Sequence, residues 1–215
     1  MSNEARLEAS LKGAWEDFAF RVQQTAEEVQ MTAERGDSVH KLIWQLANVN
    51  YWSAKGLVLN GPSISNPKQN AGSVTGLLFE LLLGAAVCGY VRNRCPGAQF
   101  YVGSRSPQHP RWPRVQVNPD LCVEVGSRLV VFEFKSAAQI DHLKHMLLLR
   151  DRYQEAGHSF FFIGGHVRAK AAVLNDALKQ QWAVFFEVSA RNAKSVSSRG
   201  VDWVFQESVR RLQAQ

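Results

Sequence analysis

Cysteine is scarce in this 215-residue chain, which has only three: Cys88, Cys95 and Cys122. Their number is odd and they are scattered, without the close pairs that structural zinc sites use. The sequence therefore indicates neither a disulfide framework nor a zinc knuckle. Such cysteine usage favours a reducing compartment, and we expect a cytoplasmic protein.

Long hydrophobic runs are also lacking. The longest apolar stretch, Leu77 to Val91, contains Glu80 and is shorter than the roughly 20 residues needed to cross a bilayer. Residues 1–18 carry acidic side chains and no continuous apolar run, so we expect no signal peptide. Internal repeats and low-complexity segments are absent from the sequence. We therefore expect no membrane partner.

Acidic residues do not predominate: 25 Lys and Arg against 19 Asp and Glu give a formal net charge of +6. A basic surface favours polyanionic partners, of which nucleic acid is the commonest, although many basic proteins bind no nucleic acid. Hydrophobic residues at 46% and charged residues at 20% are typical of a globular chain. The length predicts one domain over residues 1–215.

The first part of the chain has the pattern of helices. Apolar residues at helical spacing predict a helix over residues 3–35, and Asp37-Ser38 offers a cap for a second helix reaching Val49. We therefore expect a helical N-terminal region over residues 1–59. The Gly, Pro, Asn and Ser content of Asn60 to Ser73 predicts a loop before an apolar helix of about Val74 to Val91.

After Pro96-Gly97 the pattern changes to strands that alternate with helices. The expected elements are a strand at Gln99 to Gly103, a Pro-rich loop, two strands within Val117 to Phe134, a helix at Ala138 to Glu155, a strand at Phe160 to Gly164, a helix near Ala169 to Gln180, a strand at Ala183 to Val188, a polar loop at Ser189 to Gly200 and a helix from Asp202. This order predicts an α/β fold with a mixed central β-sheet flanked by helices.

Charged residues interrupt strands that otherwise have the composition of a core. Glu133 and Lys135 are separated by one residue, so on a strand they share a face, while Val130, Phe132 and Phe134 occupy the other. The acid and the amine should therefore be neighbours. Charges in such a segment require partners, because burying an isolated charge is costly.

Gly126-Ser127 suits a two-residue hairpin turn, because glycine tolerates the positive φ of its first position. Counting outward from a turn there places Asp120 directly opposite Glu133, with Cβ atoms about 4.5 to 5.5 Å apart. Two carboxylates at that separation repel each other unless a cation lies between them. A hard, oxygen-ligated ion such as Mg²⁺ fits, so the hairpin predicts a metal site.

Lys135, beside such an ion, is placed to orient or deprotonate an attacking water and to stabilise negative charge that develops on a phosphate. The alternative is structural: Asp120 caps a turn, and Glu133 and Lys135 form an ion pair on an exposed strand edge. The apolar residues around them argue against an edge.

Glu80 is a second acid in an apolar setting. It lies in a predicted buried helix, with Gly76 and Gly84 one turn away on either side of the same face. We expect it beside the hairpin site, because a buried carboxylate needs a cation or strong donors. The alternative is that it forms a salt bridge with Arg92 or Arg94.

A helix acid, then Pro119-Asp120, then Glu133-x-Lys135 after a hairpin resembles the PD-(D/E)xK nuclease superfamily, which has the restriction-endonuclease-like fold. The likeness covers about residues 74–164. It implies that Asp120 and Glu133 bind catalytic Mg²⁺, that Lys135 assists the nucleophile and that Glu80 supports a metal or its waters. The helix after the lysine has Leu143 where RecB-type members tend to have tyrosine, which argues against an exonuclease role.

The resemblance implies an Mg²⁺-dependent endonuclease acting on double-stranded DNA, most similar to a type II restriction endonuclease. Residues 74–190 would form the catalytic core, and residues 1–59 would support a homodimer. Two alternatives remain: a repair, recombination or mobile-element nuclease of the same fold, and a DNA-binding module without activity.

Other polar residues carry weaker signals. Basic and aromatic residues mix in the Pro-rich loop, where DNA contacts and a solvated loop are both consistent with the pattern; the candidates are Arg105, His109, Arg111 and Arg114. Lys194 and Arg199 form a second candidate phosphate-contacting loop. His142 and His145 have the spacing of metal ligands, but no acid or thiol accompanies them, and an exposed helix face explains them better.

Overall fold

The structure is a computed structural model that describes residues 23–36, 67–102, 119–136, 140–165, 182–188, 193–195 and 200–214. In chain order the elements are a helix at residues 23–35, α3 (Pro67–Arg92), β1 (Gln99–Val102), β2 (Leu121–Val125), β3 (Arg128–Lys135), α4 (Ile140–Glu155), β4 (Ser159–Gly164), β5 (Ala183–Val188), β6 (Ala193–Ser195) and α6 (Val201–Gln213). None of these helices is long and apolar enough to cross a bilayer.

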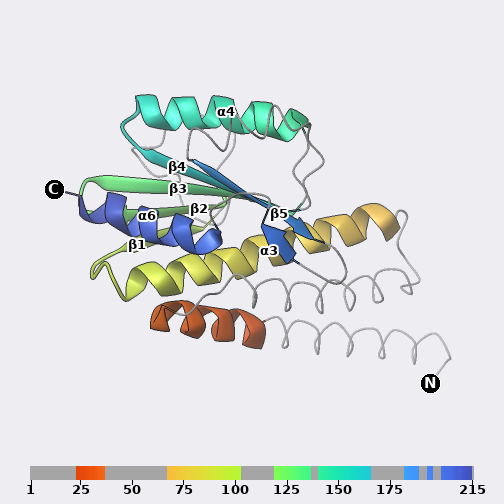
Figure 1. Ribbon diagram of the computed structural model, residues 1–215, viewed down its shortest axis with the longest axis horizontal. Coiled ribbons are helices and arrows are strands. Elements are labelled where there is room, and N and C mark those ends of the chain that lie inside the picture. The colour runs from red at the N-terminus through yellow and green to blue at the C-terminus, as the bar shows by residue number, and fades with distance from the viewer. Residues whose placement is uncertain are drawn as a thin grey trace, which may run out of the picture.

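The strands form a mixed sheet in the order β1-β2-β3-β4-β5-β6. Strands β1, β2 and β3 are antiparallel neighbours, β3, β4 and β5 run parallel, and β6 is antiparallel to β5. Figure 1 shows α4 on one face of the sheet and α3 with α6 on the other. The predicted α/β class with a mixed central sheet flanked by helices is confirmed.

Strand β3 shows why the sheet lies between two layers of helices. Its Val130, Phe132 and Phe134 pack into a core with α3 and α6, whereas Leu129 and Val131 pack into a second core under α4. Neighbouring residues of a strand point to opposite faces, so a strand with apolar residues at nearly every position is buried on both. The continuous apolar run in the sequence therefore marks a central strand and not an edge.

The hairpin between β2 and β3 follows the predicted register. Gly126-Ser127 forms the turn, with a positive φ of 59° at the glycine. Pairing begins with Val125 opposite Arg128 and continues to Leu121 opposite Phe132. The turn thus fixes which residues of the two strands meet, and it directs the start of β2 towards the end of β3.

The remaining described elements agree with their predicted bounds, with two corrections. Helix α3 begins at Pro67, so residues 67–73 are helical and not a loop. Proline is favoured in the first turn of a helix, where its missing N–H costs no hydrogen bond, and this outweighs the loop-like composition. The short strand β6 lies within the polar loop predicted for residues 189–200, because backbone pairing with β5 needs no apolar side chains.

Several predicted elements lie outside the described residues. They are the first part of the N-terminal helix (residues 3–22), the second helix (residues 38–49), the helix near residues 169–180 and the Pro-rich loop (residues 104–114). The described part of the N-terminal region, residues 23–35, is helical as expected.

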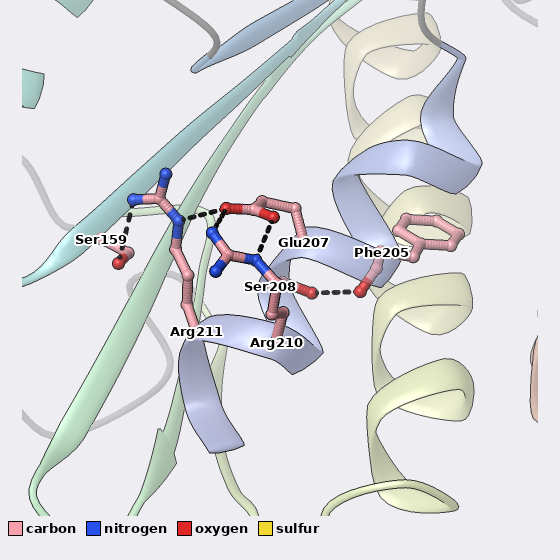
Figure 2. Close-up of polar contacts among 6 residues, drawn as sticks. All are labelled: Ser159, Phe205, Glu207, Ser208, Arg210 and Arg211. Atoms are coloured by element: carbon pink, nitrogen blue, oxygen red, sulfur yellow. Dashed lines mark hydrogen bonds and ion pairs between the residues drawn. The ribbon is translucent and has the colours of Figure 1, made fainter. Parts of the chain in front are cut away.

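Hydrogen bonds join the C-terminal end of α6 to the sheet. Figure 2 shows Glu207 accepting hydrogen bonds from Arg210 and Arg211, while Arg211 also reaches the hydroxyl of Ser159 at the start of β4. Arg128, beside the hairpin turn, donates to the carbonyl oxygen of Leu212 at 2.9 Å. These contacts join α6 to the N-terminal ends of β3 and β4, away from the Lys135 end of the sheet.

The helix at residues 23–35 lies on the outer side of α3 (Figure 1). Its last carbonyl groups accept hydrogen bonds from side chains that follow α3: Asn93 donates to Glu34 O at 2.9 Å, and Arg94 donates to Ala33 O at 3.5 Å. In the middle of the contact, Gly89 faces the backbone of Gln30 so closely that any Cβ would meet its carbonyl oxygen. The absence of a side chain at position 89 permits this approach.

We predict that Gly89→Ala lowers the free energy of unfolding by about 1 to 3 kcal/mol, because the added methyl group forces the two helices apart. Gly84→Ala is the matched control, since it lies on the same helix and no described atom is within 4 Å of the Cβ position. It should raise stability by up to about 1 kcal/mol through helix propensity. Urea unfolding measures both, and equal stability of the two variants would contradict the close packing.

Candidate active site

Four residues predicted from the sequence come together at the C-terminal end of β3. Lys135 is the common partner: its Nζ lies 3.5 Å from Asp120 Oδ2, 3.6 Å from Glu133 Oε2 and 3.9 Å from Glu80 Oε1. The residues come from three places in the sequence, namely α3, the segment before β2, and β3. The antiparallel hairpin and the packing of α3 under the sheet bring them together.

Asp120 is held by the backbone of β3. Regular pairing ends at Leu121, so Asp120 lies one residue before β2, and its Oδ2 accepts a hydrogen bond from the backbone N–H of Phe134 at 2.7 Å. Phe134 stands between Glu133 and Lys135 in the sequence. The carboxylate is therefore fixed beside both functional side chains of β3, as the hairpin register predicts.

Glu133 is the most buried member, with only 3% of its side chain exposed. Burial raises the pKa of its carboxyl well above the ordinary value, and the negative charge of Asp120 raises it further, while Lys135 acts in the opposite direction. A carboxylate in this position is costly to ionise, so a cation that approaches it gains a strong electrostatic interaction.

Glu80 enters the site from α3 with 35% of its side chain exposed. Burial raises its pKa, Asp120 raises it further, and Lys135 lowers it. Its ion pair is with Lys135, and neither arginine proposed as an alternative partner is directed to it. Arg94 lies over the ring of Tyr90, 3.7 Å from its centroid, and Arg92 lies over Phe100.

Gly76 and Gly84 lie one turn on either side of Glu80 and carry no side chain, so no bulky group of α3 stands beside Glu80 at these two positions. A Cβ at Gly76 would lie 3.8 Å from Ser136 Oγ, and at Gly84 no described atom comes within 4 Å.

Lys135 remains a cation in this setting. Burial alone would lower its pKa, but the charges of Asp120, Glu133 and Glu80 together outweigh burial and raise it. The backbone is anchored as well, because Gly165 N–H donates to Lys135 O at 2.7 Å. An ammonium group in this setting suits charge stabilisation and hydrogen-bond donation.

The donor set fits a hard divalent cation. Three carboxylates face one ammonium group, and Mg²⁺ typically takes one or a few carboxylates and keeps several waters. Within the described residues, no group of three or more acidic, histidine or cysteine side chains is arranged as a ready metal cage. The ammonium group of Lys135 lies within 3.9 Å of all three carboxylates.

Other predicted site residues are not brought to this cluster. Arg105, His109, Arg111 and Arg114, the predicted DNA contacts, lie outside the described residues, as does Arg199. His145 is exposed on α4, in agreement with a solvated helix face.

Two groups near the site were not singled out from the sequence. The backbone N–H of Phe134 fixes Asp120, and nothing in residue identity indicates this role. Tyr153 of α4 is fully buried, and its pKa is raised by burial first and then by Cys122 and Glu133. No described atom forms a hydrogen bond with its hydroxyl. A lone tyrosine in a helix carries no sequence signal for such a position.

Comparison of the chain with protein-family models, curated proteins and solved structures finds no match.

The raised pKa of Glu133 predicts a pH dependence of stability. The folded protein holds this proton more tightly than the unfolded chain, so stability should fall as the pH rises from the ordinary value of 4.5 towards the raised pKa. Glu133→Gln removes the titration. We therefore expect this variant to be more stable than the wild type at neutral pH, with a flatter pH profile, in urea unfolding with a chelator present.

Glu207→Gln is the matched control. Hydrogen bonding by Arg210 lowers the pKa of Glu207, so its stabilising contribution is present above the ordinary value of 4.5 and is lost as the pH falls through the lowered pKa. This variant should be less stable than the wild type at neutral pH, and the difference should shrink in acid. A Glu133→Gln profile parallel to that of the wild type would show that Glu133 ionises without penalty.

Proposed function

We propose that this chain is an Mg²⁺-dependent endonuclease that hydrolyses DNA phosphodiester bonds. The observation that carries the proposal is the meeting of three carboxylates from separate segments around Lys135, with Nζ 3.5 to 3.9 Å from each. Structural ion pairs usually join one acid to one base. Three acids around one lysine at the end of a buried strand instead match the requirements of metal-assisted phosphoryl chemistry.

The arrangement of elements supports a restriction-endonuclease-like fold. The antiparallel hairpin β2-β3 carries Asp120, Glu133 and Lys135, α3 carries Glu80 on one face, and α4 connects β3 to the parallel strand β4 on the other. This is the order of elements that the PD-(D/E)xK resemblance implies. Within that fold we propose a type II restriction endonuclease that acts on double-stranded DNA as a homodimer in the cytoplasm.

Asp120, Glu133 and Glu80 would hold the Mg²⁺ ion. When bound, the ion supplies Lewis-acid polarisation of a phosphate oxygen and lowers the pKa of a coordinated water. The Phe134 N–H keeps the Asp120 carboxylate oriented throughout, because this hydrogen bond does not depend on the ion. Lys135 would donate hydrogen bonds to oxygens on which negative charge develops.

A DNA-binding module without activity is the second candidate, and the net charge of +6 supports it equally well. The three carboxylates of the cluster favour an enzyme over a module that only binds DNA. A protein that only binds phosphates gains nothing from three carboxylates near its surface, because they repel the DNA backbone. The carboxylates contribute to phosphate binding only when a cation lies between them and the phosphate.

Incubation of the purified protein with supercoiled plasmid and Mg²⁺ tests the proposal, and sequencing of the ends distinguishes the nuclease types. A restriction endonuclease gives ends at one short sequence, whereas a repair, recombination or mobile-element nuclease gives ends defined by DNA structure or position. Intact plasmid at all Mg²⁺ concentrations, together with a gel shift, would favour the binding module.

Asp120→Asn should reduce cleavage on the order of 100-fold or more while DNA binding remains. The amide oxygen still accepts the Phe134 N–H, so the change removes charge and little structure. Lys135→Ala should also abolish cleavage. Asp151→Asn, which alters an exposed ion pair with Arg150 on α4, is the control and should cut at the wild-type rate. Wild-type cleavage by either site variant would refute the assignment.

Glu80→Gln separates a supporting role from a structural one. The amide keeps the size of the side chain but loses its charge, so we expect the cleavage rate to fall on the order of 10- to 100-fold and the Mg²⁺ midpoint to rise. The melting temperature should hardly change, because Lys135 keeps two other carboxylates. A large drop in melting temperature with an unchanged Mg²⁺ midpoint would show that Glu80 is only structural.

A further inference from the structure

The ammonium group of Lys135 lies where the three carboxylates face one another. Its separations from Asp120, Glu133 and Glu80 are 3.5, 3.6 and 3.9 Å, so all three acids share one positive charge. A cation bound by these acids would compete with the ammonium group for the same three carboxylates. Lys135 therefore acts as an internal counter-ion of the carboxylate cluster.

A divalent ion bound by the same three acids would lie close to the ammonium group of Lys135. Mg²⁺ binds oxygen at about 2.0 to 2.1 Å, and Nζ lies 3.5 to 3.9 Å from one oxygen of each acid, so an ion held by these acids would be a close neighbour of the ammonium group. Two positive charges in one partly buried cluster also repel each other strongly. Movement of Nζ away from part of the cluster would relieve this repulsion and so would favour binding of the ion.

Lys135 is the member that can move. It is the last residue of β3, 31% of its side chain is exposed, and its four-carbon stem is flexible. Glu133 is only 3% exposed, and Asp120 is tied to the Phe134 N–H. Displacement of the ammonium group towards solvent is thus easier than rearrangement of the acids.

We propose that Lys135 competes with the divalent ion for the carboxylates, so that the residue needed for cleavage also weakens metal binding. This inference rests on the proposed function. Lys135 pairs with the acids in the absence of an ion, and on binding of an ion its ammonium group would be released from them and could contact a phosphate. The competition raises the Mg²⁺ concentration that the enzyme requires, and it keeps the carboxylates neutralised and in place for the incoming ion.

The competition predicts opposite effects on two measurements. A lysine that merely supports the metal would, when removed, weaken metal binding and cleavage together. A competing lysine would, when removed, strengthen metal binding while cleavage is lost. Metal affinity measured without DNA therefore distinguishes the two roles independently of activity.

The test is isothermal titration calorimetry with Ca²⁺ and with Mg²⁺ on the wild type, Lys135→Met and Lys144→Met. Methionine retains an unbranched apolar stem without the charge, and Lys144 is an exposed lysine of α4 that serves as the control. We expect Lys135→Met to bind both ions at least tenfold more tightly than the wild type. Lys144→Met should bind them as the wild type does.

Thermal melts provide a second readout. Without Lys135 the carboxylates repel one another, so Ca²⁺ should raise the melting temperature of Lys135→Met more than that of the wild type. If the methionine variant fails to fold, Lys135→Gln, which retains hydrogen-bond donors, takes its place in both measurements with the same expected direction.

The outcomes separate this inference from the proposed function. Equal or weaker binding by the Lys135 variants, with clear binding by the wild type, overturns the competition and leaves the nuclease proposal standing. If neither the wild type nor the variants bind a divalent ion, the metal site itself is absent and the proposed function fails.

Discussion

The burial of β3 on both faces is the constraint on which the other elements depend. Its eight residues pair with β2 on one side and β4 on the other, and the helices cover both of its faces. Phe132 forms the aromatic centre, stacked on Phe134 and Phe161 at centroid distances of 6.2 and 5.9 Å. A strand enclosed in this way can carry charge only near its end, where solvent and partners are within reach.

That constraint explains where the polar cluster lies. Glu133 faces away from the core that contains Phe132 and Phe134, and Lys135 ends the strand at the point where its side chain becomes partly exposed. The hairpin then supplies Asp120, and α3 supplies Glu80 from beneath the sheet. The burial that stabilises β3 also raises the pKa of Glu133. Because a buried carboxylate is costly to ionise, the cluster lowers the stability of the folded protein.

The features that could be predicted from the sequence are those that depend on a few neighbouring residues. The β2-β3 register followed from one Gly-Ser turn, because a two-residue hairpin leaves no freedom in pairing, and the alternation along β3 followed from its apolar positions. The start of α3 was predicted too late, since Pro67 was interpreted as part of a loop, although proline fits the first turn of a helix equally well. Strand β6 was missed because its pairing depends on the backbone alone.

The partner of Glu80 depends on tertiary packing, and sequence reasoning left a metal site and an arginine as alternatives. The structure gives a third answer, the lysine of the proposed catalytic set. The charges of the three acids raise the pKa of Lys135 against the effect of burial, which favours its charged form while it is paired with them. If the acids bind a divalent ion as proposed, that ion and the charged lysine compete for the same carboxylates. Lys135 is the last residue of a buried strand and its side chain is partly exposed, so the geometry that pairs its ammonium group with the acids also leaves it room to turn towards solvent, as the proposed competition requires.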